Sequence, residues 1–383
     1  MLVLHLTPTD VRYDSRILKE LNSLKKLNCY EVIAFGIEEN EGHQYRGEQS
    51  ENIKVFKLLT KKLTLLPRPI RYFLNLVEAI FVLTIPGIKR RPDIIHCHDT
   101  LFLPIAVIIK LICKSKLVYD AHELESNKAG QSKFLSKYTL FIERKGWKYI
   151  DLLISVSPSI INWYNNNIGP KKNEILLNSP VFDVETLEQN KFDAQNYLRN
   201  MFKIPDNAKI FLYLGIIAKE GRAIDLILDV FKNYCTNSHI VFVGYGEYVE
   251  HIKTISAKYS NIHYHAAVKH DQVVKISKSA DVGLCLIEPV SLSDYYSLPN
   301  KLFEYAFSSL YVLTSDLPDI KLLVEQYGLG LSIKSTQKDL IEAIKKIEAI
   351  QSLKVHFEID KLHELSWNFQ EKKLINQYSN LIN

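Results

Sequence analysis

Residues 93–123 read DIIHCHDTLFLPIAVIIKLICKSKLVYDAHE, and this stretch decides the fold class. Short apolar runs at 93–97 and 116–120 each predict a buried strand. Between them, the longer apolar pattern at 104–111 predicts a helix. A strand, a helix and a second strand in this order are typical of the β-α-β units from which parallel sheets are built.

The same alternation extends on both sides of this unit. It predicts further strands at 2–6, 31–35, 53–58 and 152–156 and helices at 15–26, 74–84, 137–145 and 159–165. The pattern breaks at Asn178-Ser179-Pro180, and the polar, acid-rich residues 181–200 predict a linker. After it, a second set of strands is expected at 209–214, 239–243, 262–265, 282–286, 311–314 and 329–332, with helices between them.

The sequence therefore predicts an α/β protein with two doubly wound, Rossmann-like domains. The first covers 1–178 and the second 179–365, while 366–383 has the apolar spacing of a helix. We expect the domains to face each other across a central cleft. Open parallel sheets bind ligands beyond the carboxyl ends of their strands, so this cleft is the expected binding site.

Composition excludes several classes of protein. The chain has 383 residues, of which 47% are hydrophobic and 24% charged, as in ordinary globular proteins rather than disordered or fibrous ones. Its formal net charge of +5 is too small to indicate nucleic-acid binding. Its five cysteines are scattered and form no C-x-x-C pair, which argues against a disulfide scaffold and a zinc cluster.

We find no export signal in the first ten residues of the sequence and no membrane-spanning segment in its longest apolar stretch. The first ten residues, MLVLHLTPTD, lack the basic and apolar regions of an export signal. The longest apolar stretch, 72–88, contains Asn75, Glu78 and a Pro-Gly pair, whereas a spanning helix needs about 20 apolar residues with few charges. We expect a cytoplasmic protein without a membrane span.

Basic and apolar residues are interleaved between 60 and 91. The only acid there is Glu78, and the seven basic residues are Lys61, Lys62, Arg68, Arg71, Lys89, Arg90 and Arg91. Such a surface binds anionic lipid, with roughly 1 kcal/mol for each basic residue. We expect peripheral contact with the inner face of the plasma membrane. The alternative is an ordinary core helix with solvated flanks.

Several stretches together carry a resemblance to a known family. The strongest is LPNKLFEY at 298–305, followed by VLTSDLP at 312–318. The supporting stretches are DIIHCHD at 93–99, YDAHE at 119–123, ISVS at 154–157 and ADVGL at 280–284. In this order they resemble the retaining glycosyltransferases of family 4, in particular polysaccharide-building members with an LPNK and FEY segment. The resemblance covers almost the whole chain and implies the GT-B fold, with the C-terminal helix crossing back to the first domain.

A loop that ends at a helix start predicts an anion site near residue 300. Free backbone N–H groups and the positive end of the helix dipole hold a pyrophosphate at such a place. Lys301 would lie near the same anion, and Glu304, one turn further, can accept two hydrogen bonds from a ribose diol. Spacing alone favours a solvated carboxylate at Glu304, but the resemblance implies the ribose role. The donor-binding residues expected here are Ser297, Leu298, Pro299, Asn300, Lys301 and Glu304.

A second anion site is expected after the strand that ends at Leu214-Gly215. By register, Arg222 matches the family's diphosphate-contacting basic residue, and an arginine pairs bidentately with phosphate oxygens. Ile216 replaces the family's other basic residue, and Lys219 could compensate for it. The alternative for Arg222 is a surface arginine on an exposed helix.

Two more positions follow from the resemblance. Val268 lies at the equivalent of the base-recognising turn and could bind the nucleobase through its backbone. Tyr296 stands eight positions before Glu304, where the family has a Glu associated with the transferred sugar. Neither Glu288 nor Asp294 has that register, so the residue that meets the sugar hydroxyls stays open.

The first domain supplies the candidate catalytic and acceptor-side residues. The resemblance implies that His122, just after a predicted strand, approaches the transferred sugar and the acceptor. A neutral imidazole there could donate a hydrogen bond; the alternative is a structural histidine. Arg12 and Arg16 could meet an acceptor phosphate, and Glu123 would shape the acceptor-side turn. Asp14 or Ser15 could cap the following helix.

His96 and His98 alternate on one predicted strand and share a face. That spacing could suit a metal, but the sequence offers no evident third ligand, so a core or wall role is favoured. We expect neither a metal nor another cofactor. Arg222, Lys219, Lys301 and the helix amides would stabilise the leaving diphosphate instead.

The resemblance implies transfer of a sugar from a nucleotide-diphosphate donor, expected to be a UDP-sugar, with retention of configuration. The acceptor would be a glycan or a lipid-linked molecule in cell-surface polysaccharide synthesis, such as capsule or lipopolysaccharide. Two alternatives are kept. One is a non-catalytic nucleotide-sugar-binding or scaffolding subunit, suggested by Tyr296 and Ile216, and the other is a nucleotide-sugar epimerase of the same fold.

Overall fold

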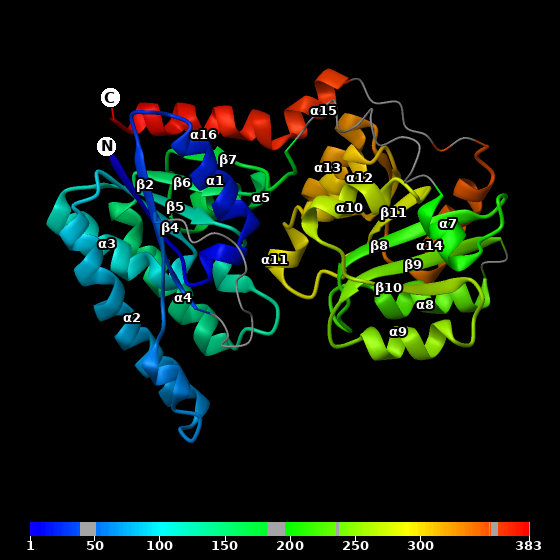
Figure 1. Cartoon of the computed structure of the whole chain (residues 1–383), viewed down its shortest axis with the longest axis horizontal. Coiled ribbons are helices and arrows are strands. Elements are labelled where there is room, and N and C mark those ends of the chain that lie inside the picture. Colours follow the sequence, from blue (N-terminus) through cyan, green and yellow to red (C-terminus); the bar gives the residue numbers. More distant parts are fainter. Residues whose placement is uncertain (39–50, 182–195, 235–236, 352, 354–358, 383) are drawn as a thin grey trace. The chain divides into compact units, whose positions relative to one another are not determined.

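The computed structural model describes residues 1–38, 51–181, 196–234, 237–351, 353 and 359–382. Most of the predicted linker therefore lies outside the described residues, as does Cys235. The chain divides into two compact units, Met1–Leu176 with Glu371–Asn383 (unit 1) and Leu177–Gln370 (unit 2). Each unit is built on one parallel sheet with helices packed against it (Figure 1).

The sheet of unit 1 has the strand order β3-β2-β1-β4-β5-β6-β7, and all its pairings are parallel. Its strands are β1 (Leu2–Leu6), β2 (Glu31–Ile37), β3 (Ile53–Phe56), β4 (Ile94–His98), β5 (Lys116–Ala121), β6 (Leu152–Ser155) and β7 (Asn173–Ile175). Nearly every residue of β1, β4, β5 and β6 is buried, because helices cover both faces of a parallel sheet. The strand order reverses between β1 and β4, where open sheets bind ligands.

Helices follow the strands of unit 1 in sequence. They are α1 (Ser15–Lys25), α2 (Arg68–Arg90), α3 (Leu103–Cys113), α4 (Lys133–Gly146) and α5 (Pro158–Asn167), with short 3-10 turns η1 (Val11–Tyr13), η2 (Leu59–Lys62), η3 (Thr100–Phe102), η4 (Glu125–Asn127) and η5 (Trp147–Tyr149). The last helix, α16 (Trp367–Ile382), returns to this unit. Its Leu374, Tyr378 and Leu381 are buried in one core cluster with residues of α1 and β1.

The sheet of unit 2 has the order β10-β9-β8-β11-β12-β13, also parallel throughout. Its strands are β8 (Lys209–Ile216), β9 (Ser238–Tyr245), β10 (Ile262–Ala266), β11 (Val282–Cys285), β12 (Tyr311–Ser315) and β13 (Gly330–Ile333). Its helices are α7 (Tyr197–Phe202), α8 (Ile224–Asn233), α9 (Val249–Ser256), α10 (His270–Ser277), α11 (Leu292–Tyr295), α12 (Asn300–Phe307), α13 (Pro318–Tyr327), α14 (Gln337–Glu348) and α15 (Ile359–Leu365).

Two apolar clusters hold unit 2 together, one on each face of its sheet. Leu212 and Leu214 of β8 belong to the cluster beneath α12 and α13, whereas Phe211 and Tyr213 belong to the cluster beneath α8 and α14. Successive side chains of a strand point to opposite faces, so each cluster covers one face. The strand order reverses between β8 and β11, and α12 packs beside this point.

The α/β prediction of two doubly wound domains is confirmed, and the largest difference concerns α2. The sequence predicted a helix at 74–84 that ends before Pro86-Gly87, yet the helix continues to Arg90. A proline inside a helix removes one hydrogen bond and disfavours the turn before it. A Cβ on Gly87 would lie 2.5 Å from Ile109 Cδ1, so α2 packs closely against α3 at this point. We attribute the continuation of the helix beyond Pro86 to this packing. The short edge strand β7 was not predicted.

Candidate functional site

Unit 2 brings the predicted donor-binding residues to the carboxyl ends of β8 and β11. Helix α12 begins here at Asn300, with Pro299 as its N-cap residue, and no side chain among the described residues caps this end. The first amides of a helix have no partner within the helix itself. Together with the helix dipole they can bind an anion such as a diphosphate.

The charges of three residues of the predicted site act on the end of β11. The thiol of Cys285, the last residue of β11, is fully buried, and burial raises its pKa. The charges of Lys301 and Arg222 act against this rise, while Glu304 adds to it. All three groups therefore lie within electrostatic range of one point, although Arg222 and Glu304 are far apart in sequence.

Lys301 is buried. Its side chain is 8% exposed, and its Nζ lies 4.2 Å from the centroid of the Tyr213 ring. The hydroxyl of Tyr213 donates a hydrogen bond to the carbonyl oxygen of Ile216 at 2.7 Å. A cation over an aromatic face is held in place and only partly solvated. Tyr213 thus links Lys301 to the last residue of β8, a role that the sequence analysis missed.

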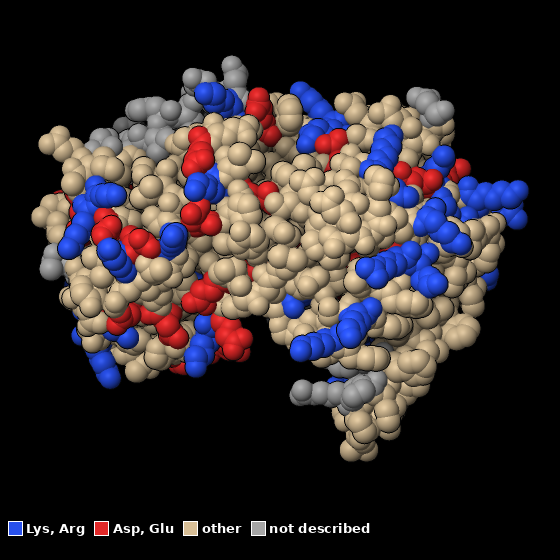
Figure 2. Space-filling view, turned by 180° about the vertical axis from the view of Figure 1, so that it is seen from behind, with Lys and Arg blue, Asp and Glu red and all other residues tan. Residues whose placement is uncertain are grey.

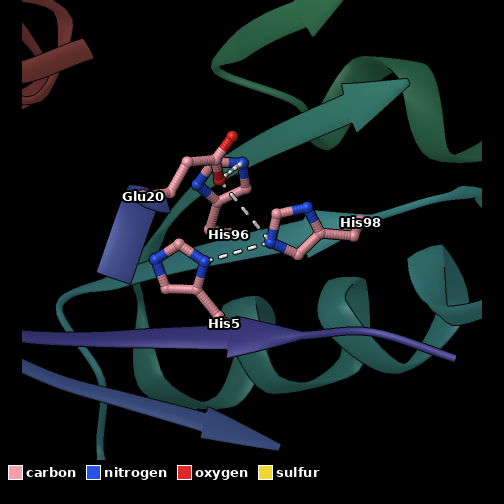
Figure 3. Close-up of side chains that lie close together, drawn as sticks. All are labelled: His5, Glu20, His96 and His98. Carbon is pink, nitrogen blue, oxygen red and sulfur yellow. Dashed lines mark hydrogen bonds and ion pairs between the residues drawn. The ribbon is translucent and has the colours of Figure 1, made fainter. Parts of the chain in front are cut away.

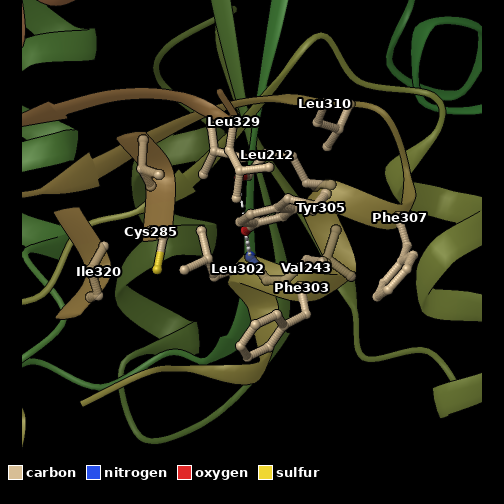
Figure 4. Close-up of a cluster of buried hydrophobic side chains, with 14 of the residues drawn as sticks. Leu212, Val243, Cys285, Leu302, Phe303, Tyr305, Phe307, Leu310, Ile320 and Leu329 are labelled. Carbon is tan, nitrogen blue, oxygen red and sulfur yellow. Dashed lines mark hydrogen bonds between the residues drawn. The ribbon is translucent and has the colours of Figure 1, made fainter. Parts of the chain in front are cut away.

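Tyr305, next to Glu304, anchors α12 to the sheet (Figure 4). Its hydroxyl accepts a hydrogen bond from the Leu214 amide at 2.9 Å and lies 3.1 Å from the carbonyl oxygen of Leu212 and 3.2 Å from that of Leu284. Gly283 leaves room for the ring, because a Cβ there would lie 2.3 Å from Tyr305 Cγ. The FEY segment contains this tyrosine, but its sequence neighbourhood gives no sign of the anchoring role.

The loop after β8 carries the other predicted anion-binding residues. Gly215 and Gly221 have φ values of +115° and +74°, which favour glycine because it has no Cβ. Lys219 is exposed and Arg222 is partly buried. The amide of Glu288 donates to the Gly221 carbonyl oxygen at 3.3 Å and joins this loop to the segment after β11.

The remaining donor-side positions follow β10 and α11. Val268 is partly buried against the core beneath α12, and Ser297 Oγ donates to the carbonyl oxygen of Asp294 at 2.8 Å. Tyr296 follows α11 as its C-cap residue. The carboxylate of Asp294 accepts a hydrogen bond from Ser291 Oγ at 2.6 Å, so this acid serves the start of α11.

In unit 1, the structure places Arg16 in the core and not at an acceptor surface. The side chain is 3% exposed, and its guanidinium donates to both carboxylate oxygens of Asp120 at 2.9 Å and to the Leu176 carbonyl oxygen at 3.0 Å. Burial opposes ionisation of Asp120, but Arg16 and His122 hold its pKa well below the ordinary value. The expected contact of Arg16 with an acceptor is corrected to a buried ion pair.

His122 lies directly beyond β5, 21% exposed. Its Nε2 is 3.0 Å from Asp120 Oδ2 and 3.1 Å from His98 Nδ1. Burial alone would lower its pKa, but the charges of Asp120 and Asp99 outweigh burial and raise the pKa of His122 to about 10. The neutral imidazole expected from the sequence is therefore replaced by an imidazolium at neutral pH, which donates hydrogen bonds and carries positive charge.

The other acceptor-side residues lie at the surface of unit 1. Arg12 pairs with Asp10 through Nε at 2.8 Å and Nη2 at 2.6 Å, and Nη2 also lies 3.5 Å from Glu38. Glu123 is exposed, 3.8 Å from Lys128 Nζ. Asp14 caps α1, its Oδ1 accepting from the amides of Arg16 and Ile17, as expected for the residue before this helix.

The region predicted to touch a membrane forms η2 and α2. Helix α2 exposes the apolar side chains of Ile70, Phe73, Phe81 and Ile85, whose spacing places them along one side of the helix. Glu78 is partly exposed and accepts hydrogen bonds from the amides of Leu59 and Thr60 at 2.8 Å. Among the described residues, no helix is both long and apolar enough to cross a membrane.

Comparison with known families decides the class of protein. Residues 24–180 match the Glycosyltransferase Family 4 domain, and residues 195–360 match the domain of Glycosyl transferases group 1. The chain is a glycosyltransferase that combines a domain of each of these two families. No curated protein sequence gave a significant match.

Solved structures with the same fold extend this finding. This glycosyltransferase superposes on a sucrose-phosphate synthase from Thermosynechococcus elongatus with a TM-score of 0.79 at 14% identity, covering 100% of this chain and 99% of that one. The HepE protein of Anabaena in complex with UDP-glucose gives 0.71 at 12% identity, with 99% and 100% covered. A lipopolysaccharide outer core galactosyltransferase, WaaB, gives 0.66 at 13% identity, with 100% and 99% covered. These likenesses establish the GT-B fold of the glycosyltransferase.

Proposed function

We propose that this glycosyltransferase transfers a sugar from a UDP-sugar to a glycan or lipid-linked acceptor, with retention of configuration. The observation that carries the proposal is that the charges of Arg222, Lys301 and Glu304 all act on Cys285 at the end of β11, and that no side chain among the described residues caps the start of α12. Two cations and free amides suit a diphosphate, and a carboxylate suits a ribose diol. The complex of HepE with UDP-glucose supports a uridine nucleotide as the donor.

In this proposal the residues of unit 2 divide the donor between them. The backbone from Ser297 to Asn300 and the side chains of Arg222 and Lys301 hold the diphosphate, with Lys219 assisting from the exposed loop. Glu304 binds the ribose, while Gly215 and the backbone at Val268 border the nucleoside. Charge that develops on the leaving diphosphate is then met by cations already in place, which lowers the barrier to transfer.

Unit 1 supplies the acceptor side. His122 is the proposed catalytic group, because its imidazolium can donate from Nδ1 while Asp120 holds Nε2. Arg12 and Glu123 are proposed to border the acceptor. By resemblance to the LPNK-type members, the product belongs to a cell-surface polysaccharide such as capsule or lipopolysaccharide.

The test combines nucleotide binding with donor turnover. Thermal shifts of the full chain are measured with UDP, GDP, ADP and CMP, and UDP release from UDP-sugars is followed without acceptor. We expect selective stabilisation by UDP, slow donor hydrolysis, and loss of both in Arg222→Gln. Arg144→Gln, an exposed arginine of α4, serves as the matched control and should behave as the wild type. Selective binding without any turnover would favour the scaffolding alternative, and no nucleotide binding would contradict the proposal.

We also propose that unit 1 rests on an anionic membrane surface through η2 and α2. Apolar side chains on one side of α2 would enter the interface, and basic residues stand at both ends, with Lys61 and Lys62 before the helix and Lys89 and Arg90 in its last turn. In Figure 2, Lys and Arg side chains are spread over the part of unit 1 on the right of the view. Anionic lipid adds electrostatic attraction to the burial of apolar surface.

Flotation with vesicles tests this surface. We expect the chain to float with vesicles of phosphatidylglycerol and phosphatidylcholine. With vesicles of phosphatidylcholine alone it should remain in the bottom fraction of the gradient. The double variant Phe73→Ser and Phe81→Ser should lose binding, whereas Leu322→Ser, which changes an exposed leucine of α13 in unit 2, should not. Binding that ignores both lipid charge and the double variant would contradict the membrane proposal.

A further inference from the structure

Four titratable side chains meet in the core of unit 1, where the strand order reverses. His5 comes from β1, His96 and His98 from β4, and Glu20 from α1 (Figure 3). His5 and His96 are register partners on adjacent strands. All four side chains are completely buried. The three histidine rings are stacked, with centroids between 4.4 and 5.3 Å apart.

The polar atoms of this cluster point at one another across short distances. His5 Nδ1 lies 3.0 Å from His98 Nε2, and Glu20 Oε2 lies 3.7 Å from His96 Nε2 and 3.8 Å from His98 Nε2. One nitrogen or oxygen from each of the four residues lies within 4.8 Å of all the others. Four potential ligand atoms therefore lie close together.

Several of these atoms have no hydrogen-bond partner among the described residues. They are Nε2 of His96, Nε2 of His5 and both carboxylate oxygens of Glu20, although Oε1 of Glu20 forms an ion pair with Arg16. A buried polar atom left without a partner costs about 1–3 kcal/mol. His96 Nε2 and Glu20 Oε2 lie 3.7 Å apart, and an ion between them would give both atoms a partner. His5 faces the same place through Nδ1.

We propose that His5, Glu20, His96 and His98 bind one divalent transition-metal ion, with Zn²⁺ as the best match. Three imidazoles and one carboxylate form the borderline donor set that Zn²⁺ takes in tetrahedral sites, whereas Mg²⁺ and Ca²⁺ prefer oxygen ligands. Zn–N bonds of about 2.0–2.1 Å put tetrahedral ligand atoms about 3.3 Å apart. Three of the separations in the structure, 3.0, 3.7 and 3.8 Å, bracket that value, and all of them are within 4.8 Å.

The surroundings of the cluster orient its ligands. His96 Nδ1 lies 2.7 Å from the hydroxyl of Tyr378, and His98 Nδ1 faces Asp120 Oδ2 at 3.4 Å. His98 Nδ1 also lies 3.1 Å from His122 Nε2, and His96 Nε2 lies 3.7 Å from Asp120 Oδ2. In the proposed site Nε2 of both histidines binds the ion, and the partners on Nδ1 orient the two rings. Arg16 Nε lies 3.2 Å from Glu20 Oε1, which leaves Oε2 directed at the histidines.

The ion would have a structural role in unit 1. It would join β1, α1 and β4 and, through Tyr378, the returning helix α16. Since the four side chains are closed off from solvent, the ion would be acquired as the chain folds, and binding free energy would add to folding free energy. The expectation of metal-independent diphosphate stabilisation in unit 2 concerns a different task and is unaffected.

Metal analysis of the full chain without an affinity tag tests the proposal directly. The chain is unfolded with a chelator, refolded with or without Zn²⁺, dialysed and analysed by mass spectrometry of the elements. We expect about one Zn²⁺ per folded chain and a higher melting temperature for the zinc-refolded sample. Co²⁺ in place of Zn²⁺ should give the intense visible absorption of tetrahedral coordination. A folded wild-type chain that takes up neither ion would overturn the proposal.

Variants then locate the ion. Glu20→Gln and His98→Gln each remove one ligand and should lose stoichiometric metal and the Co²⁺ absorption. His263→Gln is the matched control, because His263 stacks on His239 in unit 2 and lies outside the cluster; it should retain both. If the ligand variants fold, as judged by circular dichroism, and bind metal like the wild type, the ion is held elsewhere and the assignment is wrong. If the ligand variants do not fold, the zinc content and the Co²⁺ absorption of the wild-type chain still test the proposal.

Discussion

The ammonium group of Lys301 lies 4.2 Å from the centre of the Tyr213 ring. Lys301 belongs to the first turn of α12 and Tyr213 to β8, so the contact connects the two elements that border the proposed diphosphate site. The aromatic face stabilises the ammonium without neutralising it. A charge held in this way is preorganised, and an arriving anion meets it without waiting for a long side chain to be ordered.

Replacing Lys301 with methionine keeps the apolar stem and removes the charge. We expect Lys301→Met to weaken UDP binding about tenfold, or by about 1.4 kcal/mol, and to leave uridine binding unchanged, because uridine lacks the diphosphate. Calorimetric titration with both ligands measures the difference. Lys334→Met, at an exposed position after β13, is the control. Equal weakening of both ligands would mean that Lys301 serves the fold of the site and not the diphosphate.

Glu304 is predicted to distinguish ribose from deoxyribose. A hydrogen bond to a charged group contributes about 1.5–3 kcal/mol, so wild-type protein should bind UDP roughly tenfold or more tightly than 2′-deoxy-UDP. Glu304→Gln should bind the two nucleotides nearly alike. Glu342→Gln, on the exposed side of α14, should keep the wild-type preference. A preference that survives in Glu304→Gln would argue that the carboxylate does not meet the ribose.

His122 is predicted to affect turnover without affecting donor affinity. The imidazolium belongs to unit 1, while the proposed donor residues belong to unit 2. General acid and base groups contribute about 10²–10⁴-fold to rate, so we expect His122→Asn to lower kcat by about 100-fold at the least, with unchanged Kd for UDP. Steady-state assays with an identified acceptor and binding titrations separate the two effects. A variant with normal kcat would leave His122 with a structural role.

Local patterns predicted most of the fold. Each strand of β1, β2, β4, β5 and β6 was expected within two residues of its observed ends, because a buried parallel strand is a short apolar run bounded by polar residues. The extent of α2 could not be predicted locally. The helix continues through Pro86 where Gly87 packs closely against Ile109 of α3. The helical pattern of a sequence does not show such a tertiary contact.

In the candidate site, too, the features that depend on local sequence were predicted, and those that depend on distant residues were not. The start of α12, with Lys301 and Glu304, follows from the order of turn and helix residues. Arg16 was assigned to a surface because its ion-pair partner, Asp120, lies 104 residues away. The other two residues of the proposed metal site, His5 and Glu20, were not recognised from the sequence for the same reason. Only the strand order, which places β1 beside β4, brings them to His96 and His98.

Tyr305 gives a prediction about stability. Tyr305→Phe keeps the ring but removes the hydroxyl that accepts from the Leu214 amide. That amide is buried, and leaving it without a partner should cost about 1–3 kcal/mol, or a fall of a few degrees in the melting temperature of unit 2 (about 2–4 °C per kcal/mol). Tyr295→Phe, at a 40% exposed position, should melt like the wild type. Equal melting of both variants would show that water replaces the lost hydroxyl.

The last prediction concerns pH and the histidine pair of unit 2. His263 Nε2 lies 2.9 Å from His239 Nδ1, and the two rings are parallel with centroids 5.2 Å apart. Burial, and then the neighbouring His239, lower the pKa of His263 from 6.5 to about 4. Burial and the charge of Arg199 lower the pKa of His239 in the same direction.

Because the folded chain holds this proton less tightly than the unfolded chain, acid favours unfolding. The stability contributed by neutral His263 is complete above pH 6.5 and declines as the pH falls toward 4. After allowance for the part of the ring that water reaches, the loss should be on the order of 1 kcal/mol. Urea unfolding of unit 2, followed between these pH values, measures it. His263→Phe keeps the stacked ring on Phe202 and should show a shallower decline. His251→Phe, on the exposed side of α9, should keep the wild-type slope, and a wild-type slope in His263→Phe would assign the acid sensitivity to other groups.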